Sequence, residues 1–168
     1  AESGNDLYLL PYDGDTDLLQ DSSIKRTELF DDISQQSPKS VTVFLDTCYS
    51  GITRNAEQLL ANARGLRIQL KTQRAIPNRF TVFSAASNDE VALGYTEAKH
   101  GVFSYFAMKG MEGKADRDGD KKITASELSH YVRVKVQNQV LNAGKRQTPL
   151  MVGNGKRILV DWSITLIR

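Results

Sequence analysis

The chain has a single cysteine, which lies two residues after an aspartate at the end of an apolar run. The run 41–45, Val-Thr-Val-Phe-Leu, is followed by Asp46, Thr47 and Cys48. A β-branched apolar run that stops at a polar turn predicts a buried strand, and open α/β sheets place their chemistry just past the ends of such strands. A thiolate there can act as a nucleophile. The alternative is a structural cysteine, but an acidic neighbour is costly to bury unpaired, so Cys48 is the candidate catalytic residue.

Alternating aspartates mark a second candidate site, in the loop 116–127. This loop resembles the twelve-residue EF-hand loop, in which hard oxygen ligands at alternate positions surround Ca²⁺. The candidate ligands are Asp116, Asp118, Asp120, Lys122 and Glu127. Position 6, usually glycine, is Lys121, where a positive φ costs about 1–2 kcal/mol and an ammonium is an unfavourable neighbour for a cation. Calcium binding and a simple acidic connection between helices both remain open.

Strand and helix patterns alternate along the chain, which predicts an α/β fold. The predicted strands are 7–10, 41–46, 80–85 and, at the end of the chain, 157–162. The predicted helices are 24–35, 55–63, 102–112 and 125–141. Their apolar stripes at helical spacing are assigned to the core and to no function.

Composition is typical of a globular enzyme domain. The 168 residues are 40% hydrophobic and 25% charged with a net charge of +2, which favours neither nucleic acid nor membrane as the main partner. No run of 18 apolar residues occurs, and residues 1–15 lack the pattern of a signal peptide. One cysteine excludes an intrachain disulfide, which fits a reducing compartment. We therefore expect a cytoplasmic location.

Several segments resemble one enzyme family in order and spacing. The segment 46–51, Asp-Thr-Cys-Tyr-Ser-Gly, resembles the D-x-C-x-S-G nucleophile motif of metacaspase-like peptidases, prokaryotic relatives of the caspases. Four other segments resemble that family: 5–13, 80–87, 101–106 and 147–149. The resemblance implies a caspase-like, mainly parallel sheet flanked by helices and the activity of a cysteine endopeptidase. It divides the chain into 1–60, the end of the large-subunit region, a linker 61–79, and a small-subunit region 80–168.

The family places its catalytic His-Gly pair before the segment with which this chain opens. The chain has only His100 and His130, and both follow the cysteine. His100-Gly101 imitates the catalytic pair but lies where the family begins its small-subunit helix. We therefore expect a fragment that is inactive alone and whose partner is the histidine-containing N-terminal segment of the same domain. The alternative is an inactive caspase-like module that binds partners or calcium.

The resemblance also implies a preference for basic substrates. Asp46 stands where caspases have a glutamine, and a carboxylate pairs with an Arg or Lys of a protein substrate rather than with an Asp. Asp89, with Ser84 on the preceding strand, is a second candidate for the pocket. The linker 61–79 holds five basic residues and no acidic one, so it is either a solvated loop or a site of self-cleavage by such an enzyme.

Overall fold

The computed structural model describes residues 2–3, 6–15, 17–47, 76–87 and 90–163. Its strands are β1 (Glu2–Ser3), β2 (Asp6–Leu9), β3 (Ile24–Lys25), β4 (Val41–Leu45), β5 (Phe80–Ser84), β6 (Gly94–Tyr95), β7 (His100–Gly101), β8 (Lys122–Thr124), β9 (Leu150–Gly153) and β10 (Ile158–Asp161). Its α-helices are α1 (Leu19–Ser22), α2 (Arg26–Gln35), α3 (Val102–Lys109) and α4 (Ala125–Leu141).

The central sheet has the order β4-β5-β9. β4 and β5 run parallel in a register from Val41↔Phe80 to Leu45↔Ser84, as expected for two apolar runs joined by a long connection. β9 pairs with β5 antiparallel, so the sheet is mixed. The prediction of a mainly parallel sheet is therefore confirmed only for the β4–β5 pair. Within the described residues no strand pairs with the outer edge of β4.

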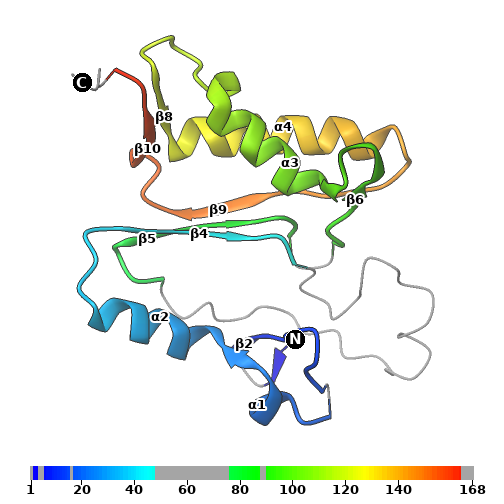
Figure 1. Ribbon diagram of the computed structural model, residues 1–168. Helices are drawn as coiled ribbons and strands as arrows, with labels where there is room; N and C mark the ends of the chain where they lie inside the picture. The colour runs from blue at the N-terminus through cyan, green and yellow to red at the C-terminus, as the bar shows by residue number, and fades with distance from the viewer. Residues whose placement is uncertain (1, 4–5, 16, 48–75, 88–89, 164–168) are drawn as a thin grey trace.

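Helices cover both faces of this sheet, with α3 and α4 on one side and α2 on the other (Figure 1). Strand alternation divides the β5 side chains between the two faces. Phe80 and Val82 pack in a core with Phe30 of α2, and the Phe30 and Phe80 rings lie 4.7 Å apart. Phe83 belongs to the other core, which is built mainly from α3 and α4. The fold is therefore a helix–sheet–helix arrangement with two apolar layers.

The predicted helix 125–141 forms as α4 with the same bounds. Thr124 and Glu127 make a capping box at its start, which satisfies two backbone N–H groups that would otherwise have no partner. The predicted helix 24–35 begins two residues later, after the short strand β3. The predicted helix 102–112 is regular only to Lys109 and then widens into a π-type turn, Gly110–Lys114. The predicted helix 55–63 lies outside the described residues.

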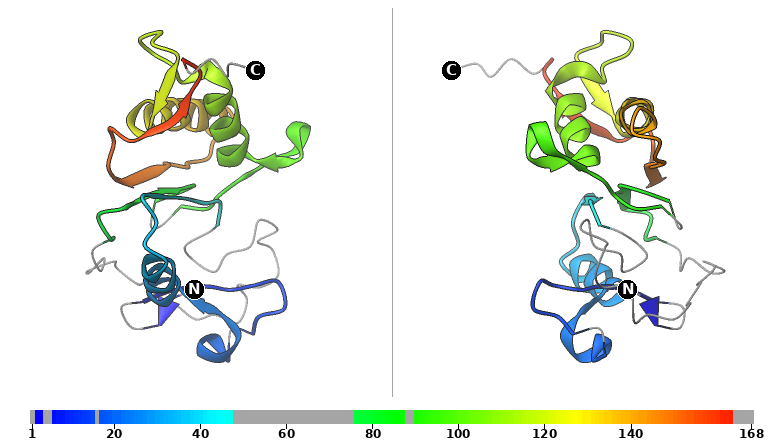
Figure 2. Two further views of the ribbon diagram at one scale, coloured as in Figure 1. Left: turned by 60° about the vertical axis from the view of Figure 1, so that its left-hand side comes forward. Right: turned by 90° about the vertical axis from the view of Figure 1, so that its right-hand side faces the viewer.

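Two predicted strands form but pair away from the central sheet. The predicted strand 7–10 forms as β2 and lies between β1 and β3 in a small antiparallel sheet. β2 and α1 lie on the α2 side of the central sheet, away from α3 and α4 (Figure 2). The predicted strand 157–162 forms as β10 and pairs with β8, which follows the acidic loop. No helix among the described residues is long and apolar enough to cross a membrane.

Candidate active site

Asp46 lies at the carboxyl end of β4, where the parallel pair finishes. The N–H of Ala85 donates to the carbonyl of Leu45 at 2.9 Å, which extends the β4–β5 ladder to the residue before Asp46. Asp46 is half-buried and lies at the edge of the sheet where parallel strands of α/β proteins present functional side chains. Cys48, two residues further on, and Asp89 lie outside the described residues.

A hydroxyl of α3 binds the Asp46 carboxylate directly. Ser104 Oγ donates to Asp46 Oδ2 at 2.6 Å, within the 2.5–2.7 Å typical of a charge-assisted O–H···O⁻ bond. Ser104 is the third residue of α3, so the carboxylate lies beside the first turn, where the positive end of the helix dipole is a favourable neighbour. Sequence analysis assigns no role to Ser104, although this residue lies within the family-like segment 101–106.

The segment after β5 is fastened by the loop before β9. Gln147 is 1% exposed; its Oε1 accepts from the N–H of Leu93 at 2.9 Å, and its Nε2 donates to the carbonyl of Ala85 at 3.0 Å. The next residue, Thr148, donates to the Glu90 carboxylate from both its backbone N–H and its hydroxyl. These contacts hold Ala85, Glu90 and Leu93 against the loop before β9. The segment 147–149 was recognised as family-like, but this bracing role was not predicted.

We expect Gln147→Leu to lower the free energy of unfolding by about 1–3 kcal/mol. The change leaves the Leu93 N–H and the Ala85 carbonyl without their partner, and an unsatisfied buried polar group costs that amount. Urea unfolding followed by circular dichroism measures it. Gln137→Leu, at an exposed position on α4, is the matched control and should stay close to the parent. Equal stability of the two variants would contradict the bracing role.

Ser84 lies at the same end of the sheet as Asp46 but on the other face. Its Cα partner is Leu45, which packs in the core on the α2 side, and parallel partners project to the same face. Asp46, by contrast, reaches Ser104 on the α3 side. Ser84 is buried. The structure therefore brings Asp46 and Ser104 together, and it places Ser84 at the end of the neighbouring strand, on the face of the sheet that carries Leu45.

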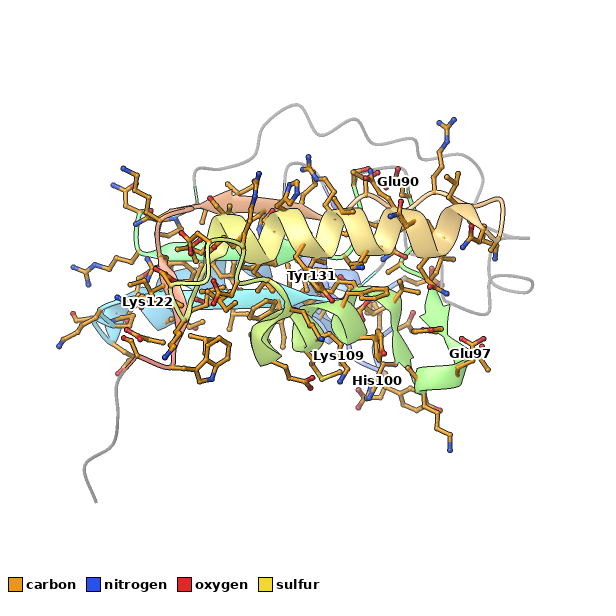
Figure 3. All side chains as sticks on the ribbon, turned by 90° about the horizontal axis from the view of Figure 1, so that it is seen from above. Glu90, Glu97, His100, Lys109, Lys122 and Tyr131 are labelled. Atoms are coloured by element: carbon orange, nitrogen blue, oxygen red, sulfur yellow. The ribbon has the colours of Figure 1, made fainter. Side chains whose placement is uncertain are left out.

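Neither histidine of the chain lies in the core. His100 is an exposed residue of the β6–β7 hairpin, and His130 is exposed on α4. Seen from above, the labelled Tyr131 and Lys109 lie where α4 and α3 run side by side. Glu97 and His100 lie on the β6–β7 hairpin, which directly precedes α3 (Figure 3). Partial burial raises the pKa of Tyr131, and a hydrogen bond from Lys109 to Glu112 raises the pKa of Lys109. The Lys109–Glu112 bond is a local contact, three residues apart, between the end of α3 and the π-type turn that follows it.

The acidic loop 116–127 brings three aspartates together. One carboxylate oxygen from each of Asp116, Asp118 and Asp120 lies within 4.8 Å of the others. Lys121, at position 6, has φ +65°, so this lysine takes the left-handed conformation that the resemblance requires. Asp116 accepts from the backbone N–H groups of Gly119 and Lys121 at 2.8 and 3.1 Å. Three carboxylates on a tight turn are a hard-oxygen donor set that fits Ca²⁺.

The two other candidate ligands make different contacts. Glu127 Oε2 accepts from the backbone N–H and the hydroxyl of Thr124, and Oε1 accepts from the N–H of Arg117 at 3.2 Å. Partial burial alone would raise the pKa of Glu127, but the hydrogen bonds from Thr124 and Arg117 outweigh it and lower the pKa. Its stabilising effect is therefore present above the ordinary glutamate pKa and lost as the pH falls through the lowered value. Lys122 donates its N–H to Asp120 at 2.8 Å.

No protein-family model matches this chain, and a search of curated proteins finds no similar sequence. The likeness to metacaspase-like peptidases therefore depends on the motifs of the chain itself.

Proposed function

We propose that the chain is part of a caspase-like cysteine endopeptidase that cleaves proteins after Arg or Lys. The observation that carries the proposal is the Asp46 carboxylate, half-buried at the end of β4 and bound by Ser104, two residues before the only cysteine. A carboxylate held in place two residues before a nucleophile in the sequence suits a substrate whose cleaved residue carries a positive charge. The parallel β4–β5 pair with helices on both faces is compatible with a caspase-like fold, and the single cysteine with a cytoplasmic location.

In the proposed mechanism the Cys48 thiolate attacks the carbonyl carbon of the peptide bond. The upstream histidine accepts the thiol proton and returns it to the leaving amine, and water then hydrolyses the thioester. The N–H of Cys48 stabilises the oxyanion that forms during attack. Asp46 holds the substrate guanidinium or ammonium, so the scissile bond stays aligned with the sulfur.

The test is the cleavage profile of the full-length protein that carries the upstream histidine. Peptides that differ only in the cleaved residue, Arg, Lys, norleucine or Asp, should be cut in the order Arg and Lys first, norleucine slowly and Asp last. The 168-residue chain alone should be inactive, because it lacks the general base. Preferential cleavage after Asp would contradict the pocket, and a full-length sequence with no His-Gly after an apolar strand would favour the inactive module.

A second proposal is self-cleavage in the basic linker 61–79, most of which lies outside the described residues. Five basic residues without an acid match the proposed pocket, so the incubated full-length enzyme should acquire new N-termini directly after an Arg or Lys of this linker. N-terminal sequencing of the products measures this. A cut that persists in Cys48→Ala would assign it to another protease.

The acidic loop is proposed as a calcium site, on the three clustered aspartates and the left-handed Lys121. We expect Lys121→Gly to raise Ca²⁺ affinity about fivefold, since a unit charge several ångströms from a divalent ion in water interacts by about 1 kcal/mol. The only tryptophan reports on the loop, because the backbone N–H of Trp162 donates to the Lys121 carbonyl at 2.9 Å. Fluorescence titration therefore measures the affinity.

Lys145→Gly, at an exposed coil position, is the matched control and should bind Ca²⁺ like the parent. Asp118→Asn should bind more weakly. A parent protein that gives no heat of binding at millimolar Ca²⁺ would leave the loop a structural connection between helices.

A further inference from the structure

Ser104 and Ser34 use their hydroxyls differently because they lie at opposite ends of their helices. Ser34, near the end of α2, donates to the carbonyl four residues earlier, with Oγ 2.7 Å from the Phe30 carbonyl oxygen, as serines inside helices commonly do. The carbonyl four residues before Ser104 belongs to His100 of β7, outside α3. Ser104 instead donates out of α3 to Asp46, 58 residues away in the sequence. The two serines are therefore a natural comparison between a hydroxyl used within its helix and one used between elements.

The Ser104–Asp46 bond connects two elements that reach the site from different directions. Asp46 directly follows the last ladder bond of β4, and Ser104 lies in the first turn of α3, whose Val102 and Phe103 are anchored in the core. The donor therefore comes from a helix anchored in the core, while the acceptor lies two residues before Cys48 in the sequence. One hydroxyl on Oδ2 restricts the rotation of the carboxylate, and a carboxylate, with about four lone-pair sites, can accept from several donors at once.

We propose that Ser104 is the positioning residue of the basic-substrate pocket: it orients the Asp46 carboxylate toward the cation of the substrate. This inference rests on the proposed function and adds a residue that the sequence did not single out. Ser104 touches neither the substrate nor the reacting atoms, and it acts only through Asp46. Its loss should therefore weaken recognition of a cationic substrate without affecting the bond-breaking steps.

The test compares Ser104→Ala, Ser104→Thr and Ser34→Ala in the full-length enzyme, using peptides with Arg or norleucine at the cleaved position. Ser104→Ala should lower kcat/KM for the Arg peptide about 10- to 100-fold, the scale of one hydrogen bond to a charged group, mainly by raising KM. Cleavage of the norleucine peptide should not change, because it does not use Asp46. Ser104→Thr keeps the hydroxyl and should retain Arg cleavage, and Ser34→Ala should match the parent.

Other outcomes overturn the proposal. Equal losses on the Arg and norleucine peptides, or the same loss in Ser34→Ala, would show a structural role only. A structural role would also follow if the losses in kcat/KM of Ser104→Ala and Asp46→Asn add fully in the double variant, since the effects of residues that act through one contact are not additive.

If the parent cleaves no peptide, the proposed function fails, and calorimetric binding of agmatine, a simple guanidinium, decides the inference. A dissociation constant for agmatine raised about tenfold in Ser104→Ala but not in Ser34→Ala upholds the inference, and an unchanged dissociation constant overturns it.

Discussion

Replacing Cys48 by alanine should abolish hydrolysis of Arg and Lys peptides by the full-length protein. The proposed mechanism forms a covalent thioester on this sulfur, and removal of a covalent nucleophile lowers kcat by several powers of ten. Cysteine and alanine are both small side chains, so we expect the variant to fold normally. Initial rates with a fluorogenic Arg peptide, together with a circular dichroism spectrum, measure both effects.

The neighbouring Thr47 supplies the control for this variant. Thr47 directly precedes Cys48 in the sequence and is exposed, so Thr47→Ala should keep activity within a few-fold of the parent. Substantial turnover by Cys48→Ala would exclude the cysteine-peptidase mechanism and leave the inactive-module alternative or a different nucleophile.

Replacing Asp46 by asparagine should lower kcat/KM for Arg peptides by about 30-fold to several-thousand-fold. The loss of the charge partner of a desolvated cation is worth about 2–5 kcal/mol. The asparagine side chain has nearly the same shape, and its carbonyl oxygen can still accept from Ser104, whose Oγ lies 2.6 Å from Asp46 Oδ2. The substitution therefore removes the charge and largely keeps the geometry. The norleucine peptide should be cut at the parental rate.

Asp116→Asn makes the same chemical change in the acidic loop and serves as the control. Assayed with chelator, it should leave the Arg-to-norleucine ratio unchanged. A parental ratio in Asp46→Asn would place the basic specificity on another residue, and an equal fall on both peptides would indicate that the turn carrying the nucleophile has moved.

Much of the fold was predictable because local signals agreed with tertiary structure. For α4 the capping pair Thr124 and Glu127 marks the start, and Leu128, Val132, Val136 and Val140 repeat at helical spacing, so its bounds were predicted correctly. β10 was predicted in place, but its pairing with β8 was not, because periodicity says which residues form a strand and not which strand they join. β9, Leu150–Gly153, was not predicted, and its place in the central sheet depends on pairing with β5, about 70 residues earlier in the chain.

The candidate site was predictable only where chemistry is written in consecutive residues. Asp46 and Cys48 share one short segment, and the aspartates of the acidic loop alternate along another. Ser104 and Gln147 act through long-range contacts instead, and a serine inside a helix is by default a local donor, as Ser34 is. Their roles depend on how α3 and the loop before β9 pack against the sheet, which no single segment encodes.

The position of β4 at the outer side of the described sheet has a consequence for handling the chain in solution. Among the described residues, the backbone N–H and C=O groups on that side of β4 face no neighbouring strand, and the Phe44 side chain on the same strand is 39% exposed. A row of open hydrogen-bonding groups beside an exposed aromatic ring is the usual starting point for edge-to-edge aggregation. This edge is where we expect a second copy of the described sheet to pair, and a charge introduced to prevent it should spare Phe44, whose ring stacks on the buried Phe83 with centroids 4.9 Å apart.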